Sequence, residues 1–158
     1  MLSITKRMST DIYTDGSCLG NPGVGGWAFV VVHNDGIVSK WANSQCQTTN
    51  NIMELTAALK ALEYASDKKM TSINLYTDSN YLKNGMTQWI QSWKSNNWKT
   101  SNKKDVKNES LWRDLDTLNS KLTVDWIHVK AHANNHYNNI VDKLANEAAH
   151  NAVTDEPF

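Results

Sequence analysis

Long apolar runs, cysteine and arginine are all scarce in this chain of 158 residues. A membrane span needs about 20 consecutive apolar residues, and without such a run we expect neither a span nor a signal peptide. The two cysteines, Cys18 and Cys46, fit neither a disulfide framework nor the spacing of a zinc site. This usage favours a reducing compartment, so we expect a cytoplasmic protein with no structural zinc. We also expect a monomer with no membrane partner.

Positive charge is concentrated in one part of a chain whose net charge is zero. Arg7 and Arg113 are the two arginines, but residues 83–107 hold six lysines against the single acid Asp105. The same window contains Trp89, Trp93 and Trp98. Lysines interleaved with aromatic residues are typical of a nucleic-acid-binding surface. The alternative is a solvated loop, with tryptophans four residues apart packing a helix onto the core.

Hydrophobic periodicity predicts alternating strands and helices. The predicted strands cover 11–14, 27–33, 37–46, 73–78 and 124–129, and the predicted helices cover 51–68, 108–120 and a last one from 139, with one or two short helices after 78. Five of the seven glycines lie in 16–26, and we interpret this link as a hairpin loop. It is not a phosphate cradle, because it lacks Gly-Lys-Ser/Thr and a strand follows it.

These elements predict an α/β fold. Short links make the first three strands an antiparallel meander, whereas helical crossovers make the last two strands parallel to the first. The result is a five-stranded mixed sheet flanked by helices. At this length we expect one folded domain, at residues 9–152, with 1–8 as an N-terminal extension and 153–158 as a C-terminal tail.

Two of the predicted strands end on the same tripeptide, Tyr-Thr-Asp, at Asp15 and Asp78. If these strands are neighbours, both carboxylates lie at the carboxyl edge of the sheet, where open α/β sheets carry their ligands. Glu54 and Asp142 are expected in the first turns of two covering helices. Four carboxylates without arginine partners would repel one another unless they bound hard cations, which prefer oxygen ligands.

Each of these acids has a simpler interpretation when it is taken alone. Glu54 lies three residues after Asn51, as in a capping box. Asp78 could cap the segment that follows it, and Asp142 could be a solvated helix residue. The metal-site hypothesis therefore depends on all four residues converging.

Four motifs occur in order along the chain: Tyr13-Thr14-Asp15-Gly16-Ser17, Thr49-Asn50-Asn51-Ile52-Met53-Glu54-Leu55, Tyr76-Thr77-Asp78-Ser79, and Val129-Lys130-Ala131-His132 with Asp142. Together they resemble the ribonuclease H type 1 family over roughly residues 9–149. Residues 89–94 and 98–100 are similar to the basic protrusion of that family.

The resemblance implies an endonuclease that hydrolyses the RNA strand of an RNA/DNA hybrid and leaves 3′-hydroxyl and 5′-phosphate ends. It implies that Asp15, Glu54, Asp78 and Asp142 hold two Mg²⁺ ions, for which Mn²⁺ could substitute. It also implies that His132 assists proton movement or product release. From the sequence alone, His136 would be an equally plausible histidine.

The resemblance further assigns residues to the two strands of the hybrid. The RNA strand, recognised by its 2′-hydroxyls, would be contacted by Cys18 (mainly through its backbone), Asn21, Asn50, Asn51 and Asn80. The DNA strand would be contacted by Thr49, Trp89, Trp93, Lys94, Trp98, Lys99, Ser101, Lys103, Lys104 and Asn108. Two departures are Gln47, where the family often has an arginine, and Ala131, where it has a glycine.

Two other functions fit parts of this pattern. One is another nuclease or strand transferase of the same fold, because a fold does not determine a substrate. The other is a catalytically inactive module that binds hybrids, although such a module would have no need for four repelling carboxylates.

Overall fold

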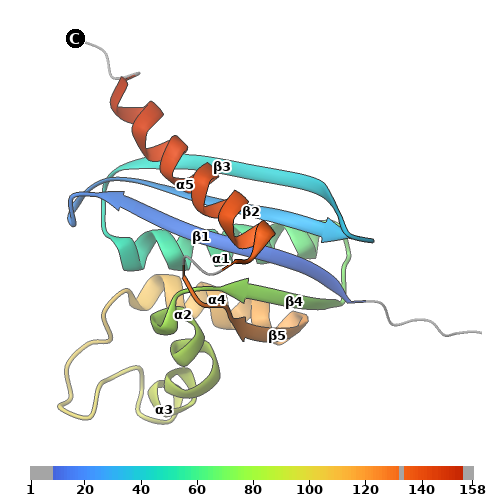
Figure 1. Ribbon diagram of the computed structural model, residues 1–158. Coiled ribbons are helices and arrows are strands. Elements are labelled where there is room, and N and C mark those ends of the chain that lie inside the picture. Colours follow the sequence, from blue (N-terminus) through green and yellow to red (C-terminus); the bar gives the residue numbers. More distant parts are fainter. Residues whose placement is uncertain (1–8, 132–133, 155–158) are drawn as a thin grey trace, which may run out of the picture.

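A five-stranded mixed sheet forms the centre of the structure, a computed structural model that describes residues 9–131 and 134–154 (Figure 1). The strands are β1 (Thr10–Leu19), β2 (Gly23–His33), β3 (Gly36–Thr48), β4 (Ser72–Thr77) and β5 (Thr123–His128). Their order in the sheet is β3-β2-β1-β4-β5, with β1, β2 and β3 antiparallel and β4 and β5 parallel to β1. The predicted fold class is confirmed.

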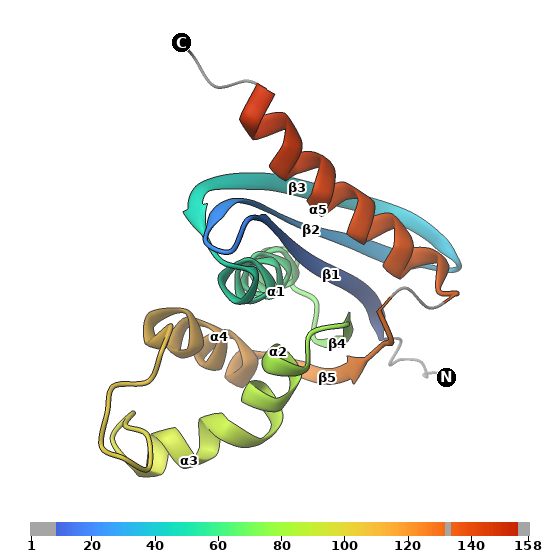
Figure 2. The same ribbon diagram turned by 60° about the vertical axis from the view of Figure 1, so that its left-hand side comes forward.

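Helices cover both faces of this sheet. They are α1 (Asn50–Asp67), α2 (Asn80–Asn84), the π-helical turn η2 (Gly85–Trp89), α3 (Ile90–Ser95), α4 (Glu109–Lys121) and α5 (His136–Thr154). Figure 2 shows α5 on one face and α1 on the other, with α3 and the loop after it projecting away from the sheet. Among the described residues, no helix is long and apolar enough to cross a membrane.

Strict alternation along the central strands divides the core into two clusters. Ile12 of β1 packs against the apolar stripe of α1, which includes Leu55 and Leu62. The next residue, Tyr13, points to the opposite face and packs with Val141 of α5. Successive residues of a strand face opposite sides, so β1 anchors a helix on each face of the sheet.

The repeated tripeptide lies in register in β1 and β4. Tyr13 pairs with Tyr76, and their rings stack with centroids 4.3 Å apart. Thr14 and Thr77 are fully buried. The same register, continued by two residues, brings Asp15 level with Asp78, as the sequence predicted.

Turn and cap residues set the ends of the elements. The predicted hairpin at 34–36 is confirmed, with Asn34 and Asp35 both at positive φ, as tight hairpins prefer. The glycine-rich link is shorter than predicted, because β1 and β2 continue through most of its glycines. The last helix begins at His136 rather than 139, since the Asn135 side chain accepts a hydrogen bond from Asn138 N at 3.0 Å.

Two glycines let the helices approach the sheet closely. A Cβ atom on Gly16 would lie 2.4 Å from Glu54 N of α1. A Cβ atom on Gly26 of β2 would lie 2.2 Å from the carbonyl oxygen of Ala145 in α5. Any larger residue would push a helix that carries an acidic residue away from the sheet.

We predict that Gly26→Ala lowers the free energy of unfolding by about 1–3 kcal/mol, because a methyl group would overpack the contact between β2 and α5. Urea denaturation measures this change. Gly36→Ala is the matched control, since a methyl group at that position would lie 3.9 Å from its nearest neighbouring atom. Equal stability of the two variants would contradict the proposed close contact.

Candidate active site

Three carboxylates converge at the carboxyl ends of β1 and β4. Asp15, Glu54 and Asp78 each offer one oxygen, and these oxygens all lie within 4.8 Å of one another. They face an open hollow of about 400 Å³. Its lining consists of Asp15, Gly16, Ser17, Asn50, Asn51, Glu54, Asp78, Ser79, Asn80, Tyr81 and Asp142. The structure therefore brings the four predicted acids to one place.

Neighbouring hydroxyl residues, not the acids, cap the helices at this site. The Thr49 side chain accepts from Ile52 N at 3.1 Å and begins α1, so Glu54 lies in the second turn and the capping-box interpretation is wrong. The Ser79 side chain accepts from Leu82 N at 3.1 Å and begins α2, so Asp78 is not the cap. Both carboxylates are consequently free to face the hollow.

Asp142 reaches the hollow from the opposite face of the sheet. The sequence predicted Asp142 in the first turn of the last helix. Because α5 begins at His136, Asp142 lies in the second turn instead. Its carboxylate lies close enough to Asp15 to help raise the pKa of that acid, and it accepts from Asn146 Nδ2 at 3.3 Å. This half-buried acid is thus part of the cluster and not a solvated helix residue.

Burial and repulsion favour the protonated forms of two of these acids, Asp15 and Glu54. Burial first, and then the charge of Asp78, raises the pKa of Asp15 from its ordinary 3.8 to about 9. Burial and the charge of Asp15 raise the pKa of Glu54 well above its ordinary value. The charged forms are unfavourable unless a cation compensates them.

The donor set fits a hard divalent cation. Glu54 Oε1 is buried and has no hydrogen-bond partner among the described residues. A buried acceptor of this kind is normally satisfied, so it indicates a ligand position. Carboxylate oxygens are the ligands that Mg²⁺ prefers, and Asp15, Glu54, Asp78 and Asp142 would hold such ions.

The residues assigned to the RNA strand lie beside the acids. Asn50, Asn51 and Asn80 line the hollow. The Asn21 side chain accepts from Asn50 N at 3.0 Å and so joins the turn after β1 to the start of α1. Cys18 Sγ donates to Gly20 O at 2.8 Å, and burial raises the pKa of this thiol. Cys18 is therefore held as a thiol, and its backbone contact with the RNA strand stays a prediction.

The protrusion, which comprises η2, α3 and the loop after it as far as Lys107, carries three tryptophans that form a continuous aromatic cluster. Trp93 lies 6.0 Å from Trp89, 6.1 Å from Trp98 and 5.4 Å from the fully buried Trp112 of α4, measured between ring centroids. Tyr81 packs against Trp89 and Trp112 and accepts a hydrogen bond from Asn108 Nδ2 at 3.1 Å. The packing alternative is thus correct for Trp93, although the partly exposed rings keep some surface available.

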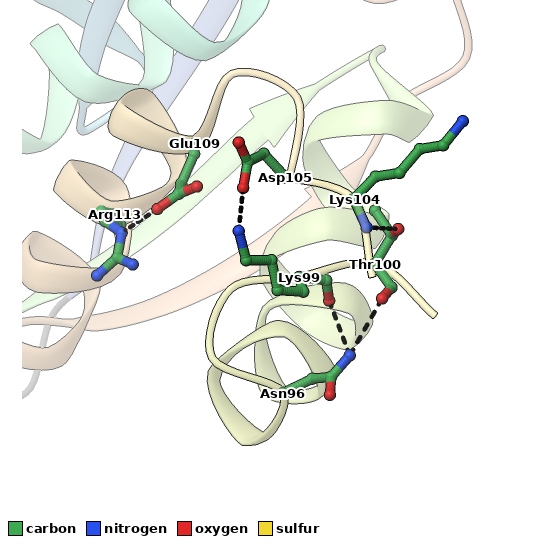
Figure 3. A network of polar contacts seen from close by, with 7 residues as sticks. All are labelled: Asn96, Lys99, Thr100, Lys104, Asp105, Glu109 and Arg113. Atoms are coloured by element: carbon green, nitrogen blue, oxygen red, sulfur yellow. Dashed lines mark hydrogen bonds and ion pairs between the residues drawn. The ribbon is translucent and has the colours of Figure 1, made fainter. Parts of the chain in front are cut away.

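Ion pairs involve some of the lysines assigned to the DNA strand. Lys94 pairs with Asp116 of α4 at 3.2 Å, and Lys99 pairs with Asp105. Figure 3 shows the Lys99 pair next to Asn96, which donates to the carbonyl oxygens of Lys99 and Thr100. In the described part of the chain, the side chains of Lys103, Lys104 and Lys107 take part in no ion pair.

Some expected residues contribute differently, and some contributors were missed. His132 lies outside the described residues, and His136 is the first residue of α5, with its ring against Tyr137. Ser101 is exposed on the protrusion loop and borders a shallow hollow with Lys99. Ser17, which ends the first motif but had no role assigned from the sequence, lines the site two residues after Asp15, a spacing that places both on one face of β1.

We predict that the metal-free protein loses stability as the pH rises between about 4 and about 9. Across this range folded Asp15 keeps a proton that the unfolded chain releases, so the free energy of unfolding falls, by at most about 1.4 kcal/mol per pH unit for this one proton. Asp15→Asn should show a shallower decline. Urea denaturation in EDTA at several pH values measures both slopes, and parallel slopes would contradict the raised pKa.

Comparisons with known proteins agree with this geometry. The RNase H family model matches residues 7–150. A "Ribonuclease H" of Francisella philomiragia is 47% identical over 144 residues, which cover 91% of this chain and 93% of the relative.

Two solved structures are also similar. LC9-RNase H1, described as a type 1 RNase H with the type 2 active-site motif, superposes with a TM-score of 0.81 and 30% identity over 94% of this chain and 75% of that one. LC11-RNase H1 in complex with an RNA/DNA hybrid, at 22% identity and a TM-score of 0.72 over 92% of this chain and 99% of that one, shares the fold. From these matches and the carboxylate cluster, this chain belongs to the RNase H family of enzymes.

Proposed function

We propose that this protein is an endonuclease that hydrolyses the RNA strand of RNA/DNA hybrids, using two Mg²⁺ ions and leaving 3′-hydroxyl and 5′-phosphate ends. The observation that carries the proposal is the convergence of Asp15, Glu54 and Asp78 within 4.8 Å, in a hollow that Asp142 also lines. The hybrid bound by LC11-RNase H1 supports the choice of substrate.

Different residues of the site would bind the metal ions, contact the RNA strand and assist proton movement. The four carboxylates would hold the ions, which supply an activated water and charge stabilisation when they are bound. The exposed asparagines Asn50, Asn51 and Asn80 offer neutral donors and acceptors suited to 2′-hydroxyls and bases. His132, assigned from the sequence, would assist proton movement. We take residues 9–152 as the catalytic domain, acting as a cytoplasmic monomer.

The DNA strand would be bound mainly by the protrusion, together with Thr49 and Asn108. Thr49 uses its hydroxyl to cap α1, and Asn108 bonds to Tyr81, so both are held rigidly in place. The partly exposed side chains of Trp89 and Trp98 suit contacts with sugars. Lys103, Lys104 and Lys107, which lack ion-pair partners among the described residues, would neutralise phosphates.

We expect cleavage of a labelled RNA/DNA hybrid and little cleavage of RNA/RNA or DNA/DNA duplexes. Asp78→Asn should lower the turnover number by about 100-fold or more, since a bound metal contributes several kcal/mol to transition-state stabilisation. Asp114→Asn, at an exposed position of α4, is the control. Near-normal turnover by the Asp78 variant in millimolar Mg²⁺ would refute the site. Cleavage of all duplexes alike would favour another nuclease of this fold, and absence of cleavage by the wild type would favour an inactive hybrid-binding module.

We further predict that replacing Lys103, Lys104 and Lys107 together by glutamine raises KM for the hybrid and leaves the turnover number almost unchanged. Each lysine that contacts a phosphate contributes about 0.7–0.9 to the slope of log affinity against log salt, so the variant's KM should depend less on salt. A control variant replaces the exposed Lys40, Lys68 and Lys121, away from the protrusion. Identical salt slopes in wild type and the protrusion variant would show that these lysines do not bind the substrate.

A further inference from the structure

Asn146 links Asp142 to strand β1. It lies one helical turn after Asp142 on α5, and its Nδ2 donates to Asp142 O at 3.0 Å and to Asp142 Oδ1 at 3.3 Å. On its other side, Asn146 Oδ1 accepts from Ser17 Oγ at 2.8 Å. A side chain with no assigned role therefore contacts one of the four site carboxylates and a residue that lines the hollow.

The spacing of strand and helix explains why these contacts form as a pair. Asp15 and Ser17 are two residues apart on one face of β1, which separates them by about 6.8 Å. Asp142 and Asn146 are four residues apart on one face of α5, which separates them by about 6 Å along the axis. The two intervals match, so Asp15 meets Asp142 while Ser17 meets Asn146.

The hydrogen-bond network has one consistent direction. Both Asp142 atoms that contact Asn146 are acceptors, so the amide nitrogen must face them and the amide oxygen must face Ser17. The Ser17 hydroxyl therefore donates to Asn146. A neutral donor of this kind orients the Asp142 carboxylate without neutralising the charge that a metal ion needs.

Asp142 needs such an orienting contact more than the other acids. Asp142 lies outside the group of three oxygens that converge within 4.8 Å. Repulsion from its neighbours favours rotamers that turn the carboxylate away. We propose that Asn146, held by Ser17, is a positioning residue that keeps the Asp142 carboxylate turned toward Asp15 for metal binding. This inference rests on the proposed function, because it takes Asp142 to be a metal ligand.

Calorimetric titration with Mn²⁺ alone, on the folded protein without substrate, tests this role directly. Asn146→Ala should weaken Mn²⁺ binding by about tenfold, as loss of a residue that orients a metal ligand typically does. Ser17→Ala should weaken it less. The double variant should resemble Asn146→Ala, because both substitutions break one network. Asn139→Ala, exposed on the same helix, is the control and should bind Mn²⁺ like the wild type.

Hybrid cleavage adds a second readout. At fixed Mg²⁺, Asn146→Ala should lower the turnover number while KM for the hybrid stays close to the wild-type value. Thermal denaturation of each variant shows whether it is folded, and Ser17→Ala tests the same link without altering α5. A variant that loses stability but keeps normal Mn²⁺ affinity and turnover would overturn the positioning role in favour of a structural one.

Asp142→Asn, titrated in parallel, separates this inference from the proposed function. If Asp142→Asn binds Mn²⁺ like the wild type, Asp142 is not a ligand and the proposed metal site fails at this residue, together with the inference. If Asp142→Asn weakens binding and Asn146→Ala does not, the inference alone is overturned.

Discussion

The close approach of like charges is the constraint on which the rest of this structure depends. Three carboxylate oxygens lie within 4.8 Å of one another, one of the acids is almost completely buried, and none of the described residues that line the hollow is an arginine. Such an arrangement destabilises the metal-free fold, so it must be held by packing elsewhere. The two apolar clusters on either side of the sheet supply that packing, and Gly16 and Gly26 let the helices lie close enough for the acids to meet.

Strand β1 combines the structural and chemical roles. One face, with Ile12 and Thr14, is buried against α1, while the other carries Tyr13, Asp15 and Ser17 toward α5. A slip of one residue in the register of β1 would exchange its two faces and turn Asp15 and Ser17 away from α5. The stacked pair of Tyr13 and Tyr76 fixes the register with β4, and therefore the distance between the two strand-end aspartates.

The protrusion, proposed to bind the hybrid, is a separate element from the carboxylate site. Its tryptophans join Tyr81 and the buried Trp112 in one aromatic cluster, so the element is anchored although it projects from the sheet. Ion pairs with Asp105 and Asp116 partly neutralise its lysines. Fewer unpaired lysines are therefore available to bind a polyanion than the excess of lysine over acidic residues in the sequence suggests. The best candidates for phosphate contacts are consequently the lysines of the loop at 103–107, which take part in no ion pair among the described residues.

The sequence by itself determined the sheet and the pairing of Asp15 with Asp78, because alternation, short links and the repeated Tyr-Thr-Asp are local patterns with direct consequences for strand pairing. Only the tertiary structure decided how the acids are held. Asn, Asp, Ser and Thr all cap helices, so the choice of Thr49 and Ser79 over the neighbouring Asn51 and Asp78 could not be predicted locally. The bond from Ser17 to Asn146 joins residues 129 positions apart, and such contacts exist only once packing brings β1 and α5 together.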